Sequence, residues 1–199
     1  MKGKIEFSFL TGNYHKFIEA KEALSIFPDI ELNQINEEKM EFKDDGVDDP
    51  IFEIAKKAAE VAVKKYNAPV VVEDAGLFFN AYPGFPGMNT KWTIKRIGYD
   101  GILRLLDGLD RAAYFRSVIA YTSPNDIKEG NVFLFDGKIE GHISTEVIGH
   151  DVDCMDYDRI FIPLGETSTF SLIMDKKKTM SHRKIAFQKL GEFLVNKKS

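Results

Sequence analysis

The order of apolar segments along the chain limits the folds that are open to it. Six residues, Ile5–Leu10, predict a buried strand, and Thr11-Gly12-Asn13 interrupts it. Residues 14–27 then repeat apolar side chains at helical spacing until Pro28 ends the pattern. Because strands and helices are mixed in this way along the whole chain, the sequence predicts an α/β or α+β protein with a largely central sheet.

The remaining segments extend this pattern without an internal repeat or a linker. A helix is expected from Asp49-Pro50, an N-cap followed by proline, to about Tyr66. A short strand over 69–72 is expected to end at Glu73-Asp74-Ala75-Gly76. The other expected elements are strands over 30–35, 111–122 and 159–163, helices over 90–97 and 101–106, a hairpin joining 132–135 to 138–145 through an Asp136-Gly137 turn, and a closing helix capped by Ser181.

Composition restricts the class of protein. With 199 residues and 44% hydrophobic content, the chain can bury a core as one domain over 1–199, and a single cysteine, Cys154, excludes a disulfide framework or a multi-thiolate zinc site. The formal net charge of −4 argues against a nucleic-acid partner. Apolar runs are too short to span a membrane. We therefore expect a soluble, cytoplasmic protein that contacts neither nucleic acid nor membrane.

The turn after the first strand is a candidate anion site. A tight turn between a buried strand and a helix directs free backbone N–H groups, aided by the helix dipole, at a ligand. Lys16 adds a cation in the first turn of the helix, although the spacing of a P-loop is absent. Such a turn, taken alone, is usually a simple connector.

Glu73 and Asp74 are candidate metal ligands. Neighbouring side chains of a strand point to opposite faces, so both carboxylates reach one site only if the strand ends there. Paired carboxylates at such an end suit Mg²⁺, which prefers oxygen ligands, and Glu41 could add another. Spacing alone nevertheless favours an ordinary N-cap or a solvated turn.

Two later segments also carry polar chemistry. Ser181-His182-Arg183 opens a helix, where His and Arg can hold an anion or hydrogen-bond a base edge, although a cap and a surface charge explain them equally well. The acidic segment 150–158 lacks the glycine and the closing glutamate of a calcium loop, so we reject a dedicated metal loop there.

Taken in order, these motifs resemble the inosine triphosphate pyrophosphatase family nearly from end to end. The matching motifs are Thr11-Gly12-Asn13-Tyr14-His15-Lys16, Val70-Val71-Val72-Glu73-Asp74, Pro86-Gly87, Lys91-Trp92, Tyr157-Asp158, Thr169-Phe170 and Ser181-His182-Arg183. Each motif is weak alone, but their order and spacing are specific. The resemblance implies an elongated, two-lobed α/β fold with a long mixed sheet, a nucleotide cleft between the lobes, and a homodimer.

The resemblance further implies Mg²⁺-dependent hydrolysis of ITP, dITP and XTP to a monophosphate and pyrophosphate. Asp74 would be a metal ligand and the base, with Glu73 and Glu41 supporting the metal. Substrate contacts are implied for Thr11, Asn13, Lys16, Lys57 (Lys56 if the helix register slips), Ala75, Lys91 and Lys177. Tyr157 would stack on the base, and Asp158, His182 and Arg183 would distinguish its 6-oxo group from a 6-amino group.

The chain departs from the family pattern on the base-recognition side. The departures are Met155-Asp156, Arg159, Leu172 and Lys176-Lys177-Lys178. The reaction type is therefore better determined than the base preference. Two alternatives stay open: a general nucleotide phosphohydrolase that releases phosphate, and a nucleotide-binding protein that has lost turnover.

Overall fold

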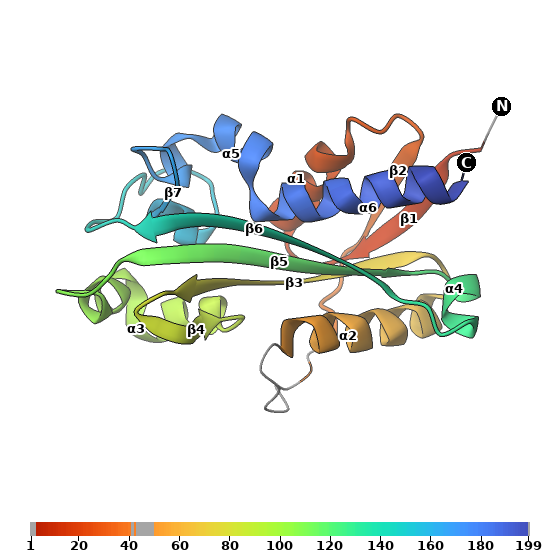
Figure 1. The fold of residues 1–199 in the computed structure, drawn as a ribbon, viewed down its shortest axis with the longest axis horizontal. Coiled ribbons are helices and arrows are strands. Elements are labelled where there is room, and N and C mark those ends of the chain that lie inside the picture. The colour runs from red at the N-terminus through yellow and green to blue at the C-terminus, as the bar shows by residue number, and fades with distance from the viewer. Residues whose placement is uncertain (1–2, 41, 43–49, 199) are drawn as a thin grey trace. The chain divides into compact units, whose positions relative to one another are not determined.

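A computed structural model of the chain describes residues 3–40, 42 and 50–198, and Figure 1 shows its elements. The strands are β1 (Ile5–Leu10), β2 (Ile30–Ile35), β3 (Val70–Phe79), β4 (Tyr82–Gly87), β5 (Ala112–Thr122), β6 (Phe133–Ile143) and β7 (Phe161–Pro163). The helices are α1 (Tyr14–Leu24), α2 (Pro50–Tyr66), α3 (Thr90–Leu105), α4 (Pro124–Lys128), α5 (Met174–Met180) and α6 (His182–Lys198), with 3₁₀ turns η1 (Asp156–Arg159) and η2 (Phe170–Leu172).

The strands form one mixed sheet in the order β2-β1-β3-β5-β6-β7, with β4 paired to β3. β1 is parallel to both β2 and β3. β4 is antiparallel to β3, and β7 is antiparallel to β6. The mixed α/β class predicted from the sequence is thus confirmed. The chain divides into two compact units, and β3, β5 and β6 contribute residues to both.

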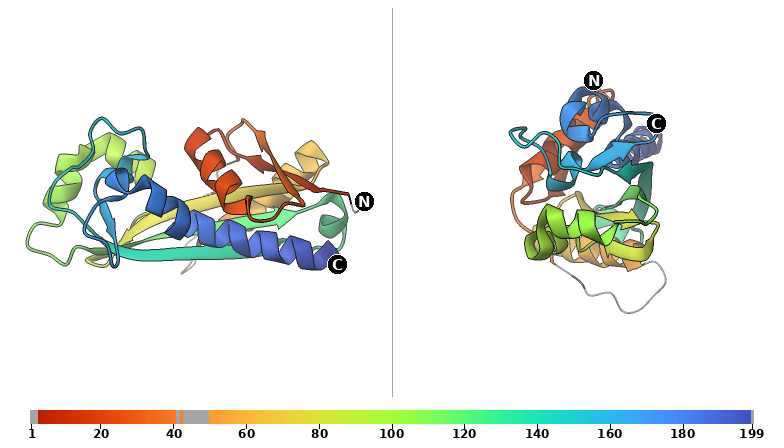
Figure 2. Two further views of the ribbon diagram at one scale, coloured as in Figure 1. Left: turned by 90° about the horizontal axis from the view of Figure 1, so that it is seen from above. Right: turned by 90° about the vertical axis from the view of Figure 1, so that its left-hand side faces the viewer.

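Unit 1 comprises Met1–Asp74, Ser117–Gly137 and Arg183–Ser199. Its core gathers apolar side chains of β1, α1 and α6, including Phe9, Leu24 and Phe187. The rings of Phe9 and Phe187 lie 5.2 Å apart, which joins the first strand of the chain to its last helix. Figure 2 shows α6 as one long helix that ends at the C-terminus. The turn after β1 thus connects a strand and a helix that both pack in this core.

Unit 2 comprises Ala75–Arg116 and Lys138–His182. Its core contains Leu77, Phe79, Ile102 and Phe161, all fully buried. β3 and β4 approach closely at Gly76, where an added Cβ would lie 2.5 Å from the Gly87 carbonyl oxygen. Only glycine permits this approach between the two backbones.

Two sequence-based boundaries are wrong, and both errors have a tertiary cause. β3 does not end at Glu73-Asp74 but continues to Phe79, because its later apolar residues alternate into the core of unit 2. The predicted Asp136-Gly137 hairpin turn lies within a single strand, β6. Pairing of β6 with β5 in the sheet outweighs the turn preference of that pair.

Other expectations differ in detail. α1 ends at Leu24, before the residues preceding Pro28, and residues 156–159 form a 3₁₀ turn ahead of β7. The two expected helices after residue 90 are joined as α3, with a non-helical break at Gly98 (φ 64°). β4 and α4 were not predicted. α2 begins at Pro50 as expected, but its proposed cap, Asp49, lies outside the described residues.

Candidate functional site

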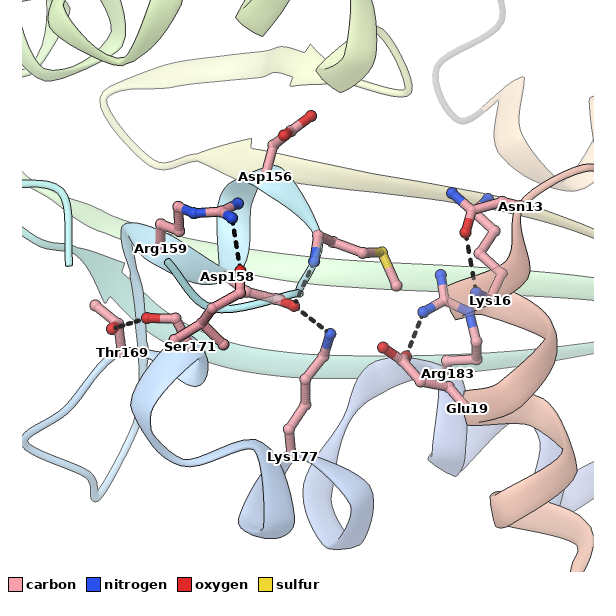
Figure 3. A network of polar contacts seen from close by, with 12 residues as sticks. Asn13, Lys16, Glu19, Asp156, Asp158, Arg159, Thr169, Ser171, Lys177 and Arg183 are labelled. Carbon is pink, nitrogen blue, oxygen red and sulfur yellow. Dashed lines mark hydrogen bonds and ion pairs between the residues drawn. The ribbon is translucent and has the colours of Figure 1, made fainter. Parts of the chain in front are cut away.

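The turn after β1 is shaped by its own side chains. The Asn13 side chain accepts a hydrogen bond from the Lys16 amide at 3.1 Å and so caps α1, as Figure 3 shows. Thr11 Oγ1 accepts from the Asn13 amide at 3.1 Å. At Gly12 an added Cβ would lie 2.9 Å from the Glu38 carboxylate. Three of the predicted phosphate contacts, Thr11, Asn13 and Lys16, therefore belong to one ordered turn.

Strand register brings this turn level with the predicted carboxylates. Phe9 pairs with Val71 in the parallel β1–β3 ladder, two residues before Glu73, and Lys16 Nζ lies 3.2 Å from Glu73 Oε2. β1 ends before this turn, whereas β3 continues past Glu73 to Phe79, so the turn lies beside the middle of β3. The structure therefore joins the turn and Glu73 within unit 1.

Glu73 is only 3% exposed and meets donors at both carboxylate oxygens. Its Oε1 accepts a hydrogen bond from Ser117 Oγ at 2.6 Å and lies 2.8 Å from Arg183 Nε. Its Oε2 lies 3.2 Å from Lys16 Nζ. These contacts compensate the cost of burying the carboxylate.

Arg183 is 1% exposed and lies between two carboxylates. Its Nη1 donates to Glu19 Oε2 at 2.5 Å, in addition to the contact of Nε with Glu73 (Figure 3 draws the Glu19 bond). Burial lowers the pKa of Arg183, but the charges of Glu73 and Glu19 outweigh it and raise that pKa above its ordinary value. The guanidinium is thus held inside unit 1, and its predicted contact with a base edge stays a prediction.

Asp74, the neighbour of Glu73, has different surroundings. It is 7% exposed, and its Oδ1 lies 3.0 Å from the ammonium of Lys39. The Asp74 carboxylate already contacts a cationic group, so a divalent cation is a suitable ligand for it. Glu41, the other predicted ligand, lies outside the described residues. Within the described part of the chain, no group of three or more His, Cys, Asp or Glu side chains is placed to hold a metal.

Unit 2 holds most of the residues predicted to recognise the base. Lys177 Nζ and Asp158 Oδ2 are 2.6 Å apart, both residues are 2% exposed, and Asp158 also accepts from the Met155 amide at 3.2 Å (Figure 3). Tyr157 is buried in the core, and its hydroxyl donates to the Thr90 carbonyl at 3.1 Å. Burial raises the pKa of Tyr157. Lys177 therefore neutralises Asp158 here, whereas its predicted phosphate contact stays a prediction.

The other predicted site residues have less distinctive surroundings. His182 stacks on Phe115 with ring centroids 4.9 Å apart. Lys91 is exposed at the start of α3, Ala75 is half-buried in β3, and Lys57 is half-buried in α2. Of the departures from the family pattern, Arg159 donates to the Val152 carbonyl at 2.7 Å, so it braces the segment before η1.

Sequence reasoning missed three residues of these ionic groups, namely Glu19, Lys39 and Ser117. Glu19 could have been found, because it lies three residues after Lys16 on the same face of α1. Ser117 and Lys39 meet Glu73 and Asp74 across long sequence separations, and no local pattern indicates such contacts.

No described helix has the length and apolar content needed to cross a membrane.

Comparisons with known proteins agree with these motifs. The chain is 39% identical to the dITP/XTP pyrophosphatase of Saccharolobus solfataricus over 192 residues, covering 96% of this chain and 94% of the relative. It is 38% identical to the protein of that name in Methanopyrus kandleri over 190 residues, covering 94% and 95%. The solved structure of a HAM1 protein from Coxiella burnetii matches with a TM-score of 0.75 and 25% identity, covering 96% and 99%. Since the Ham1 family model also matches residues 7–193, the chain belongs to the Ham1 family.

Proposed function

We propose that this protein hydrolyses non-standard purine nucleoside triphosphates, namely ITP, dITP and XTP, to a monophosphate and pyrophosphate, and so cleanses the nucleotide pool. The observation that carries the proposal is the contact of Glu73, in the middle of β3, with Lys16 of the capped turn that follows β1, next to Asp74 in the sequence. The name shared by the relatives supports the substrate class.

The proposed reaction is attack of water on the α-phosphorus. A bond forms between the water oxygen and this phosphorus, the bond to the bridging oxygen breaks, and pyrophosphate leaves with the electron pair. Asp74 accepts the proton of the water, which a carboxylate does efficiently when it is held in place. Lys16 and Lys57, with Lys91 and Lys177, would neutralise the charge that develops on the leaving group.

A divalent cation, for which we propose Mg²⁺, would be held by Asp74 with Glu41. When bound, it would supply charge neutralisation for the phosphates and a more acidic water. The fit rests on the carboxylate chemistry of Asp74 and on the cationic group that already faces it. The carboxylate of Glu73, the remaining predicted ligand, already contacts Ser117, Arg183 and Lys16.

Base selection is proposed for Tyr157, Asp158, His182 and Arg183. A 6-oxo group accepts hydrogen bonds and a 6-amino group donates them, so Arg183 and a ring N–H of His182 would favour hypoxanthine and xanthine over adenine. Asp158 and Tyr157 are held by Lys177 and by the Thr90 carbonyl. This fixed geometry would give the selection its precision.

One experiment separates the proposal from its two rivals. The protein is incubated with Mg²⁺ and, in turn, ITP, XTP, dITP, GTP and ATP, and pyrophosphate and phosphate are assayed separately. Pyrophosphate from the first three substrates supports the proposal. Phosphate as the primary product identifies a general phosphohydrolase, and tight binding without product identifies a binding protein.

We also infer from the resemblance that the protein is a cytoplasmic homodimer. Light scattering of the purified protein measures the mass directly, and a particle of twice 22.6 kDa is expected. A monomer over a wide concentration range would contradict this inference.

A further inference from the structure

The two neighbouring carboxylates of β3 have different partners. β3 continues through Glu73 and Asp74, and consecutive side chains of a strand point to opposite sides. The contacts agree with this geometry. Glu73 meets Ser117, Arg183 and Lys16, whereas Asp74 meets Lys39. Glu73 and Asp74 are therefore neighbours in the sequence, but their carboxylates contact different groups within unit 1.

Glu73 belongs to a row of four alternating charges. Glu19 contacts Arg183 at 2.5 Å, Arg183 contacts Glu73 at 2.8 Å, and Glu73 contacts Lys16 at 3.2 Å. The Arg183 side chain is 1% exposed, while that of Lys16 is 26% exposed. The row thus begins in the interior and ends at an accessible ammonium in the first turn of α1, beside the capped turn.

A metal ion would have to displace these partners to bind Glu73. Arg183 is always protonated and is buried, so moving it away would strand a charge inside the unit. Asp74 differs, because its ion-pair partner Lys39, although its side chain is only 10% exposed, is a lysine on a flexible stem and not an arginine held between two carboxylates. Exchange of one cation for another therefore requires much less rearrangement at Asp74 than at Glu73.

We propose that Glu73 is a positioning residue that holds Lys16 and Arg183, and not a ligand of the divalent cation. This inference rests on the proposed function. Glu19 and Ser117 support Glu73 from either side. The row of charges holds the Lys16 ammonium where a phosphate group would meet it, before any substrate arrives.

Metal binding tests the division of roles directly. Wild-type protein, Glu73→Gln and Asp74→Asn are titrated with Mn²⁺ in a calorimeter without nucleotide. Asp74→Asn is expected to weaken binding by about tenfold or more, and Glu73→Gln by less than about twofold. Equal weakening in the two variants would overturn the proposal, as would a wild-type protein that binds no metal.

The positioning role is tested with inorganic tripolyphosphate, which requires neither turnover nor metal. Lys16→Met is expected to raise the Kd about tenfold in the wild-type background and less than about threefold in Glu73→Gln, because Lys16 has already lost its anchor. Lys57→Met, the control, should raise the Kd by the same factor in both backgrounds. An equal Lys16→Met effect in both backgrounds would overturn the positioning role.

A folding control keeps the test decisive. Thermal unfolding is recorded for each variant, and Ser117→Ala replaces Glu73→Gln if the latter does not fold. Ser117→Ala keeps both charges and is expected to leave Mn²⁺ affinity unchanged while reducing the Lys16→Met effect. If pyrophosphate release is absent but the tripolyphosphate coupling persists, the proposed function fails while the positioning role stands.

Discussion

Buried ionic groups occur in both units, but they are built differently. In unit 1, Glu73 and Arg183 contact each other and have three further charged or hydroxyl partners from α1 and β5, and the group extends to Lys16 near the surface. In unit 2, Lys177 and Asp158 form a compact pair, each 2% exposed. A network with several partners can lose one and remain compensated, whereas a pair that loses one partner leaves a buried charge.

The two units also differ in how far the chain departs from the family pattern. The departures, at Met155, Asp156, Arg159, Leu172 and Lys178, all lie in unit 2. Unit 1 retains the turn, the lysines of α1 and α2, and both carboxylates. Chemistry on the phosphate side requires particular groups in particular places, whereas packing around a buried pair can be achieved by several side chains. This contrast predicts where substitutions will affect catalysis and where they will affect stability.

The largest effect is expected at Asp74 in unit 1. Asp74→Asn should lower kcat for dITP by about 10²–10⁴-fold and leave nucleotide affinity largely in place, because an amide is a poor base. Pyrophosphate release measures the rate. The control is Asp151→Asn, an exposed aspartate of unit 2, which should leave the rate unchanged. Near-normal turnover in Asp74→Asn would contradict the expectation that substitutions in unit 1 affect catalysis.

The next effect tests the compact pair of unit 2. Lys177→Met should lower the free energy of unfolding by about 3–5 kcal/mol, because the buried charge of Asp158 loses its lysine partner. Urea unfolding measures the loss, and the double variant Asp158→Asn/Lys177→Met should recover part of it. Lys178→Met, at an exposed ion pair with Asp175, should cost less than about 1 kcal/mol. A raised KM with unchanged stability would instead support the predicted phosphate contact of Lys177.

A smaller effect is expected in the network of unit 1. Glu19→Gln should cost about 1.5–3 kcal/mol of unfolding free energy, because Arg183 keeps its contact with Glu73. The same urea measurement applies, with Glu22→Gln on the same helix as the control. A loss larger than that of Lys177→Met would show that the network is no more tolerant than the pair.

The smallest effect distinguishes two neighbouring lysines of α2. Lys57→Met should raise KM for dITP about tenfold, and Lys56→Met less than about twofold, because their side chains point about 100° apart around the helix. Both lysines are half-buried in unit 1, so the pair is well matched. The reverse result would assign the phosphate contact to Lys56.

Much of the fold could be predicted because local patterns carried it. The apolar run of β1, the helical spacing of α1 and the Pro50 start of α2 are properties of neighbouring residues. The end of β3 and the Asp136-Gly137 turn were wrong for the opposite reason. Both segments have polar or turn-forming residues that the sheet accommodates through partners far away in the chain, such as Ser117 for Glu73.

The chemical groups of the candidate site were already contained in the order of residues: a turn before a helix, two consecutive carboxylates, and lysines at helix starts. What those groups do to one another required the folded chain. Continuation of β3 past Glu73 placed its carboxylate against Ser117 and Arg183 and left Asp74 facing Lys39. Side-chain direction in a strand alternates with each residue, so the roles of these two neighbours depend on strand extent and sheet pairing, which are properties of the assembled unit.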